Sequence, residues 1–205
     1  MPTLINEDQR DCLQEIANVA MGQSADRLAR LLDVFVVLSI PNVSILSPTD
    51  IAMTLISLQD SADHQQPLSG VCQGFIGGGI AGEVMLIFNG TDYEDLARML
   101  KYTDHSTREA RNELLMDTAN VLTGSCMHGF AEQLDTQFSF GPPMLLGENF
   151  DIPSLLNNQR KVPWKRALVI EINYTIEDHS INCDLLIVIS ERSIQGLLER
   201  LNYLI

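Results

Sequence analysis

The chain has 205 residues, of which 45% are apolar and 20% charged, values typical of a folded globular protein with a sizeable core. Its formal net charge is −14, with 13 Lys and Arg against 27 Asp and Glu and no basic cluster, which disfavours nucleic acid and anionic membranes as partners. The longest apolar runs fall far short of the roughly 20 residues that span a bilayer, and no basic-plus-apolar leader pattern is present, so we expect a cytoplasmic protein.

The first predicted element is a long helix that ends at about Asp33. Asn6 and Gln9 have the spacing of an N-terminal capping box, and two acidic residues fall in the first turn, where they meet the positive end of the helix. A β-branched run then ends at Pro41, which opens an irregular or edge-strand region. The expected elements are a strand at residues 34–39, a strand at about 52–58 and a polar loop at 60–66.

Two apolar runs flank the glycines at 77–79, which is the pattern of a β-hairpin. A phosphate-binding loop is the alternative, but no Lys-Ser/Thr pair follows the glycines and the next segment has a strand pattern. Further capping boxes at residues 91–94 and 106–109 predict a short and a second long helix. The remaining expected elements are strands at 71–76 and 82–88, helices at 92–102 and 107 to about 136, strands at 166–175 and 182–189 joined by a turn at 177–180, and a last helix at 191–203.

A polar stripe runs along the first predicted helix. Asp11, Glu15 and Asn18 are spaced by four and then three residues, so their side chains fall on one face, and Gly22 leaves the next position of that face open. The opposite face is apolar. The polar stripe therefore faces solvent or a partner, and taken alone it is typical of a solvated helix surface.

The stripe recurs in the second half of the chain, as Glu113, Asp117, Asn120 and Gly124. Asn18 and Asn120 stand 102 positions apart, and the same offset relates the two glycines and Pro41 to Pro143. A merely solvated surface gives no reason for Asn and Gly to keep this register. The order of long helix, strands and short helix is also repeated, which indicates an internal duplication.

The sequence therefore predicts an α+β fold, a single domain over residues 1–205 with pseudo-twofold symmetry. Repeat one covers about residues 6–103 and repeat two about 106–205. The two long helices are expected to pack together on one side of a shared, mainly antiparallel sheet.

The common catalytic and metal-binding motifs are missing from the sequence. The four cysteines are far apart with no C-x-x-C pair, so we expect buried, reduced thiols rather than zinc ligands, and the four histidines are scattered. Two carboxylates on an exposed helix, such as Asp11 and Glu15, also lack the burial that separates the pKa values of an acid and base pair.

The spacing Asp11-x3-Glu15-x2-Asn18-x22-Pro41 resembles the D/S-x3-E-x2-N-x22-P signature of the CheC, CheX and FliY phosphatases of bacterial chemotaxis. The second copy keeps the spacing with Glu113 in place of Asp or Ser and Asp117 in place of Glu. Two motif copies in a duplicated chain are most similar to CheC. The resemblance implies a CheC-like fold and hydrolysis of the aspartyl phosphate of a CheY-type response regulator.

The resemblance also implies the roles of the site residues. Asn18 and Asn120 would hold the attacking water, and Glu15 and Asp117 would pair with a lysine of the regulator. Docking would involve the remaining stripe residues, Asp11, Gly22, Glu113 and Gly124. No cofactor of its own is implied, since Mg²⁺ would be carried by the regulator. Because Asp117 is one methylene shorter than Glu, we expect the second site to be the weaker.

Two alternatives and one further partner stay open at this point. The chain could be a non-catalytic module that docks a response regulator or a chemotaxis protein, as the resemblance of the FliM middle domain to CheC suggests, although that domain lacks the Glu and Asn motif. It could be a structural duplication in which the two Asn side chains cap each other in the core. A CheD-type deamidase is a further partner that the resemblance allows.

Overall fold

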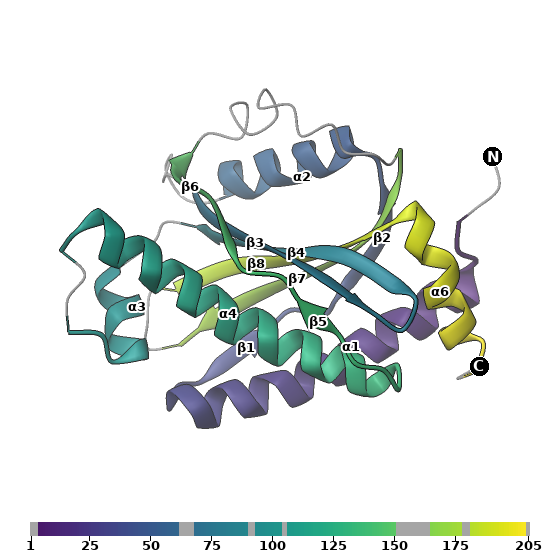
Figure 1. Ribbon diagram of the computed structural model, residues 1–205, viewed down its shortest axis with the longest axis horizontal. Helices are drawn as coiled ribbons and strands as arrows, with labels where there is room; N and C mark the ends of the chain where they lie inside the picture. The colour runs from purple at the N-terminus through teal and green to yellow at the C-terminus, as the bar shows by residue number, and fades with distance from the viewer. Residues whose placement is uncertain are drawn as a thin grey trace.

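The structure of the protein is a computed structural model that describes residues 4–61, 68–89, 93–103, 106–150, 165–177 and 181–203. Figure 1 shows one twisted sheet with helices on both of its faces. The helices are α1 (Glu7–Leu32), α2 (Pro48–Ser61), α3 (Tyr93–Leu100), α4 (Arg108–Gln133) and α6 (Glu191–Leu201), and the strands are β1 (Val36–Leu38), β2 (Asn42–Leu46), β3 (Leu68–Gly77), β4 (Ile80–Asn89), β5 (Ser139–Phe140), β6 (Met144–Phe150), β7 (Ala167–Ile176) and β8 (Ile181–Ser190). The predicted α+β class is confirmed.

The sheet has the symmetry that a duplication predicts. Its strand order is β1-β7-β8-β4-β3-β5, with β2 also paired to β7 and β6 to β3, and every pair is antiparallel. The counterparts in the two halves are β1 and β5, β3 and β7, and β4 and β8. Exchanging each strand for its counterpart gives the same order read in reverse. The pseudo-twofold axis therefore passes between β4 and β8, and the outer strands of each half pair with strands of the other half.

The two long helices lie together on one face of the sheet, as predicted, and α2 covers part of the other face (Figure 1). Their contact is in their C-terminal halves, where Ser24 Oγ donates a hydrogen bond to Ser125 Oγ over 3.1 Å. Cys126 Sγ lies 3.6 Å from Met21 Sδ in the same interface. The main core fills the space between this helical layer and the sheet.

Local signals in the sequence placed most of these elements correctly. Asn6 caps α1, since its side chain accepts a hydrogen bond from the Gln9 amide while the Gln9 side chain accepts one from the Asn6 amide. The hairpin turn between β3 and β4 is formed by Gly78 and Gly79, with φ of 56° and 80°. Positive φ at both central residues is the geometry of a type I′ turn, so the hairpin interpretation is confirmed.

One predicted element is wrong. Residues 52–58 belong to helix α2 and not to a strand. Pro48 occupies the first position of that helix, and Ser47 and Asp50 exchange two hydrogen bonds, of 2.8 Å and 3.2 Å, between side chain and amide. This capping box fixes the start of a helix and outweighs the strand preference of the β-branched residues that follow.

Smaller differences concern element ends. Helix α4 is capped by Thr107, whose hydroxyl accepts from the Ala110 amide, rather than by Ser106. The loop at 60–66 is partly the end of α2, and its residues 62–66 lie outside the described part of the chain. The first two residues of the capping box at 91–94, and residues 178–180 of the turn at 177–180, also lie outside it.

The cysteines carry free thiols, three of them buried and Cys12 only partly buried. Burial raises the pKa of Cys126 to about 12, so this thiol stays protonated at neutral pH. Within the described residues, none of the helices combines the length and apolar character that crossing a bilayer requires.

Candidate functional site

The polar stripe of α1 faces outward, as the helical spacing predicts. Asp11, Glu15 and Asn18 are exposed, whereas Leu13 and Ala17 between them are fully buried. A Cβ added at Gly22 would meet no atom within 4 Å, so the stripe ends in open space. The helix thus offers a carboxylate and a carboxamide to an approaching surface.

Two side chains of this stripe have no partner within the described part of the chain. Arg10 Nε lies 3.7 Å from Asp11 Oδ1, an exposed ion pair that contributes little to stability. Glu15 and Asn18, by contrast, make neither a hydrogen bond nor an ion pair with any described residue. A buried core supports the backbone beneath them, while their polar atoms are available to a ligand or a partner.

The second stripe has the same outward direction. Glu113, Asp117 and Asn120 are exposed on α4, and a Cβ at Gly124 would likewise meet no atom within 4 Å. Both asparagines being exposed excludes the alternative in which Asn18 and Asn120 cap each other in the core.

The two stripes differ in the contacts of their acidic residue. The phenol of Tyr102, just beyond α3, donates a hydrogen bond to the Asp117 carboxylate. This bond, together with burial and the nearby charges of Asp117 and Glu113, raises the pKa of Tyr102 to about 12. The Arg111 guanidinium of α4 lies 5.3 Å from the centre of the Tyr93 ring of α3. Helix α3 therefore contacts α4 near both of its ends, and Tyr102 reaches the second stripe itself.

The stripes lie in different parts of the helical layer. The acidic and asparagine residues of each stripe occupy the N-terminal half of their helix, before the Ser24–Ser125 contact between α1 and α4. Figure 1 shows these halves at opposite ends of the molecule, α6 beside that of α1 and α3 beside that of α4. The two stripes are thus separate surfaces, and the fold does not join them into one.

The prolines of the repeated pattern belong to the sheet edges. Pro41 separates β1 from β2, and Pro143 comes directly before β6. Since proline has no amide hydrogen, it interrupts an edge ladder at the point where the strand breaks. Two residues before each proline, a backbone hydrogen bond joins the chain to the sheet. The Ser39 amide donates to the Asn173 carbonyl over 3.0 Å, and the Gly141 amide donates to the Gly74 carbonyl over 2.9 Å. The equal spacing from Asn18 to Pro41 and from Asn120 to Pro143 thus covers, in each half, the rest of the long helix and one short edge strand.

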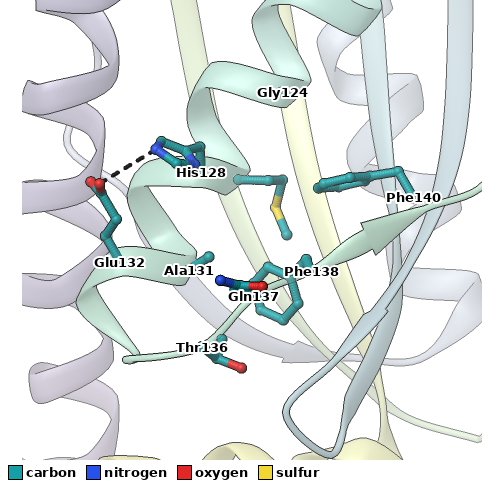
Figure 2. Close-up of a pocket in the computed structure, with 9 residues that line it drawn as sticks. Gly124, His128, Ala131, Glu132, Thr136, Gln137, Phe138 and Phe140 are labelled. Carbon is teal, nitrogen blue, oxygen red and sulfur yellow. Dashed lines mark ion pairs between the residues drawn. The ribbon is translucent and has the colours of Figure 1, made fainter.

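A pocket of about 510 Å³ lies next to the second stripe, between α4 and the segment that leads into β5 (Figure 2). Gly124 forms part of its wall, and Phe138 and Phe140 line the opposite side. At its rim, His128 Nε2 lies 3.4 Å from Glu132 Oε1. Glu132 also accepts a hydrogen bond of 2.8 Å from Arg27 of α1, which lowers the pKa of the Glu132 carboxyl.

No family model matches the chain. Among solved structures, FliY of Thermotoga maritima is similar over 98% of this chain and 99% of its own, with a TM-score of 0.69 and 17% identity. The FliM middle domain of H. pylori aligns over 96% of this chain and 99% of its own, with a TM-score of 0.61 and 12% identity.

CheX of Desulfovibrio desulfuricans covers 86% of this chain and 99% of its own length, with a TM-score of 0.53 and 12% identity. The chain has the CheC/CheX/FliY fold. The predicted CheC-like architecture is thereby confirmed, whereas the closer resemblance to CheC itself stays a prediction. Because the FliM middle domain has the same fold, the fold alone does not decide what the two stripes do.

Two features of the site are not predicted by the sequence: the contact of Tyr102 and the pocket beside Gly124. The repeat aligns Tyr102 with Tyr203, and this repetition was a sequence signal that pointed to Tyr102. No spacing rule, however, predicts its contact with Asp117. The pocket depends on how the segment after α4 folds back, for which the sequence has no local signal.

Among the described residues, no cluster of three or more His, Cys, Asp or Glu side chains could hold a metal ion.

Proposed function

We propose that this protein hydrolyses the aspartyl phosphate of a CheY-type response regulator. The observation that carries the proposal is the exposed pair Glu15 and Asn18, which lies one helical turn apart on a face left open at Gly22 and has no polar partner among the described residues. The pair has the spacing of the CheC, CheX and FliY signature, and it is supported on the fold shared with FliY and CheX.

The chemistry suits a sparse site. Water attacks the phosphorus in line, the bond from phosphorus to the aspartyl oxygen breaks, and the products are inorganic phosphate and the free carboxylate. An acyl phosphate is already activated, so the catalyst mainly positions the water. The Asn18 carboxamide can do so, because its oxygen accepts a hydrogen bond from the water while its amide group donates to a phosphoryl oxygen.

The acidic residue supplies docking. Glu15 pairs with a lysine of the regulator and sets the helix over the acyl phosphate, while Asp11 and Gly22 border the contact. The charge on the phosphoryl group is balanced by Mg²⁺ and lysine held by the regulator, so no metal ligand is required of this chain. Asp117 and Asn120 take the corresponding roles at the second site, with Glu113 and Gly124 at its border.

A second candidate function is a docking module without catalysis. The likeness to the FliM middle domain favours it, since that domain has the same fold. Such a module would bind the regulator through the same faces and leave the lifetime of the phosphoryl group unchanged. The presence of Asn in both stripes supports the phosphatase instead, because docking alone needs no water-positioning amide.

The test follows phosphate release from purified, phosphorylated CheY-type regulators of the source organism. We expect the wild-type protein to accelerate release, Asn18→Ala to lose about tenfold to a hundredfold of the rate at that site, and Asn18→Ala/Asn120→Ala to lose all acceleration. Gln23→Ala is the matched control, since it removes an exposed amide of α1 that lies off the stripe.

The outcomes separate the two candidates. Regulator binding without any faster release would refute the phosphatase and support the docking module. Losses of equal size from Asn18→Ala and Asn120→Ala would contradict the prediction that the first site is the stronger. A CheD-type deamidase stays a predicted partner, to be tested by adding it to the same assay.

A further inference from the structure

We propose that Tyr102 is a positioning residue that holds Asp117 against α3, so that the second site docks a regulator only after this phenol releases the carboxylate. The inference rests on the proposed function and deepens it, because it names the group that makes the two sites unequal. The inference concerns Asp117, the acidic residue that docks the regulator. The role of Asn120 in holding the attacking water is unchanged by it.

The contact is fixed by the end of helix α3. Lys101 follows the helix with φ of 60°, in the left-handed region, and the amide of Tyr102 donates to the Ala97 carbonyl over 2.8 Å. This is the hydrogen-bond pattern of a Schellman cap, and it aims the residue after the cap back across the helix end. Tyr102 thereby reaches Asp117 from a defined backbone position and not from a free loop.

The other end of α3 is anchored as well. The Tyr93 ring lies under the Arg111 guanidinium, at 5.3 Å, one and a half turns before Asp117 on α4. Buried Leu96 and Met99 pack the same short helix into the core. These contacts fix α3 on α4, so the backbone of Tyr102 is kept within reach of Asp117.

The first site has the same tyrosine but not the same contact. Tyr203 stands at the matching place after α6, and its side chain is 90% exposed. Glu15, which corresponds to Asp117, has no hydrogen-bond partner in the described part of the chain. The tyrosine therefore contacts the docking acid in one half of the molecule only.

The electrostatics favour a held state at neutral pH. Any tyrosine phenol is protonated at neutral pH, and here the hydrogen bond to Asp117 raises the pKa of Tyr102 further, so the phenol stays able to donate to the carboxylate. A lysine of the regulator must compete with this donor for the short side chain of Asp117. At the first site, a lysine meets the Glu15 carboxylate, for which no described residue competes.

The test measures affinity for a beryllofluoride-activated CheY-type regulator in a Glu15→Lys background, which removes docking at the first site. We expect Tyr102→Phe to tighten binding by about threefold to tenfold, because one charge-assisted hydrogen bond no longer has to be broken. Tyr203→Phe in the same background is the matched control and should leave the affinity unchanged. The phosphatase assay of Asn18→Ala/Tyr102→Phe should show a lower KM at unaltered kcat.

A second measurement reads the contact without any regulator. In protein labelled with ¹³C-tyrosine, the Tyr102 phenol should stay protonated at about pH 11, whereas in Asp117→Asn it should be mostly ionised, with the ordinary tyrosine pKa of about 10. Ionisation of Tyr102 in the wild type at that pH would overturn the inference, whatever the activity.

The other outcomes of these assays also test the inference. Unchanged or weaker binding by Tyr102→Phe, with the tyrosine titration as expected, would overturn the inference and leave the proposed function standing if wild-type protein still accelerates phosphate release. A wild-type protein that neither binds nor dephosphorylates the regulator would overturn both.

Discussion

Gly129 of α4 sits against the backbone of α1, and replacing it with alanine should push the two long helices apart. The added Cβ would lie 2.7 Å from the Ala20 carbonyl oxygen and 3.3 Å from the Ala20 carbonyl carbon. Because these are backbone atoms, they yield only if α1 moves. We expect overpacking to cost about 2–3 kcal/mol. Alanine regains about 1 kcal/mol of helix propensity, which leaves a net loss of about 1–2 kcal/mol.

Urea unfolding followed by circular dichroism measures this loss, and the Tm should fall by about 2–8 °C. Gly124→Ala on the same helix is the matched control. Its Cβ meets nothing, so the variant should gain about 0.5–1 kcal/mol from propensity alone. Gly129→Ala as stable as the wild type, or more stable, would refute the close helix contact. Gly124→Ala less stable than the wild type would show that propensity does not govern these positions.

Three further predictions concern other contacts. Asn6→Ala should cost about 1 kcal/mol in urea unfolding, because α1 loses its capping box, and an unchanged midpoint would argue against that cap. Gly196→Ala should cost about 1–3 kcal/mol, since its Cβ would lie 2.4 Å from the Gly79 carbonyl oxygen of the β3–β4 turn, and a thermal melt equal to that of the wild type would contradict this contact. The pKa of Glu132 is lower in the folded than in the unfolded state because of Arg27, so its contribution is present above the unfolded value of 4.5 and is lost as the pH falls through the folded value. Arg27→Gln should therefore lose stability mainly above that pH and differ little from the wild type in stronger acid, which a pH series of urea midpoints checks.

Features that depend on helical spacing were predictable from the sequence. Asp11, Glu15 and Asn18 fall on one exposed face because the spacing of four and three residues matches the helix period, whatever the tertiary structure. The N-cap at Asn6 and the paired glycines of the hairpin turn are equally local. The repeat then extended the same prediction to the second half of the chain.

Helix α2 shows where local patterns compete. Its β-branched residues favour a strand, and a proline such as Pro48 often marks an irregular region, yet a proline at the first helical position is also a normal start for a helix. The exchange of hydrogen bonds between Ser47 and Asp50 decides for the helix. The Ser47–Asp50 capping pair around Pro48 is the local sequence signal of this helix start.

The contact of Tyr102 with Asp117 depends on tertiary structure and so was beyond sequence analysis. The residues are 15 positions apart, and they meet only because α3 packs on α4 and ends in a left-handed cap. The repeat aligns Tyr102 with Tyr203 and thereby suggests equal roles, whereas one is hydrogen-bonded and the other is exposed. The inequality of the two halves appears only in three dimensions.

The exchange of outer strands between the halves bears on how the chain folds during synthesis. Val36 of β1 pairs with Ile176 of β7, a separation of 140 positions, so the ribosome must complete most of the protein before β1 has a neighbour. The outer edge of β3 likewise waits for β5 and β6. Contacts this distant make folding slow, and unpaired edges favour aggregation until they close. The first half of the nascent chain thus keeps unpaired sheet edges until the second half is made, and a chain cut between the repeats would give two fragments that need each other to complete the sheet.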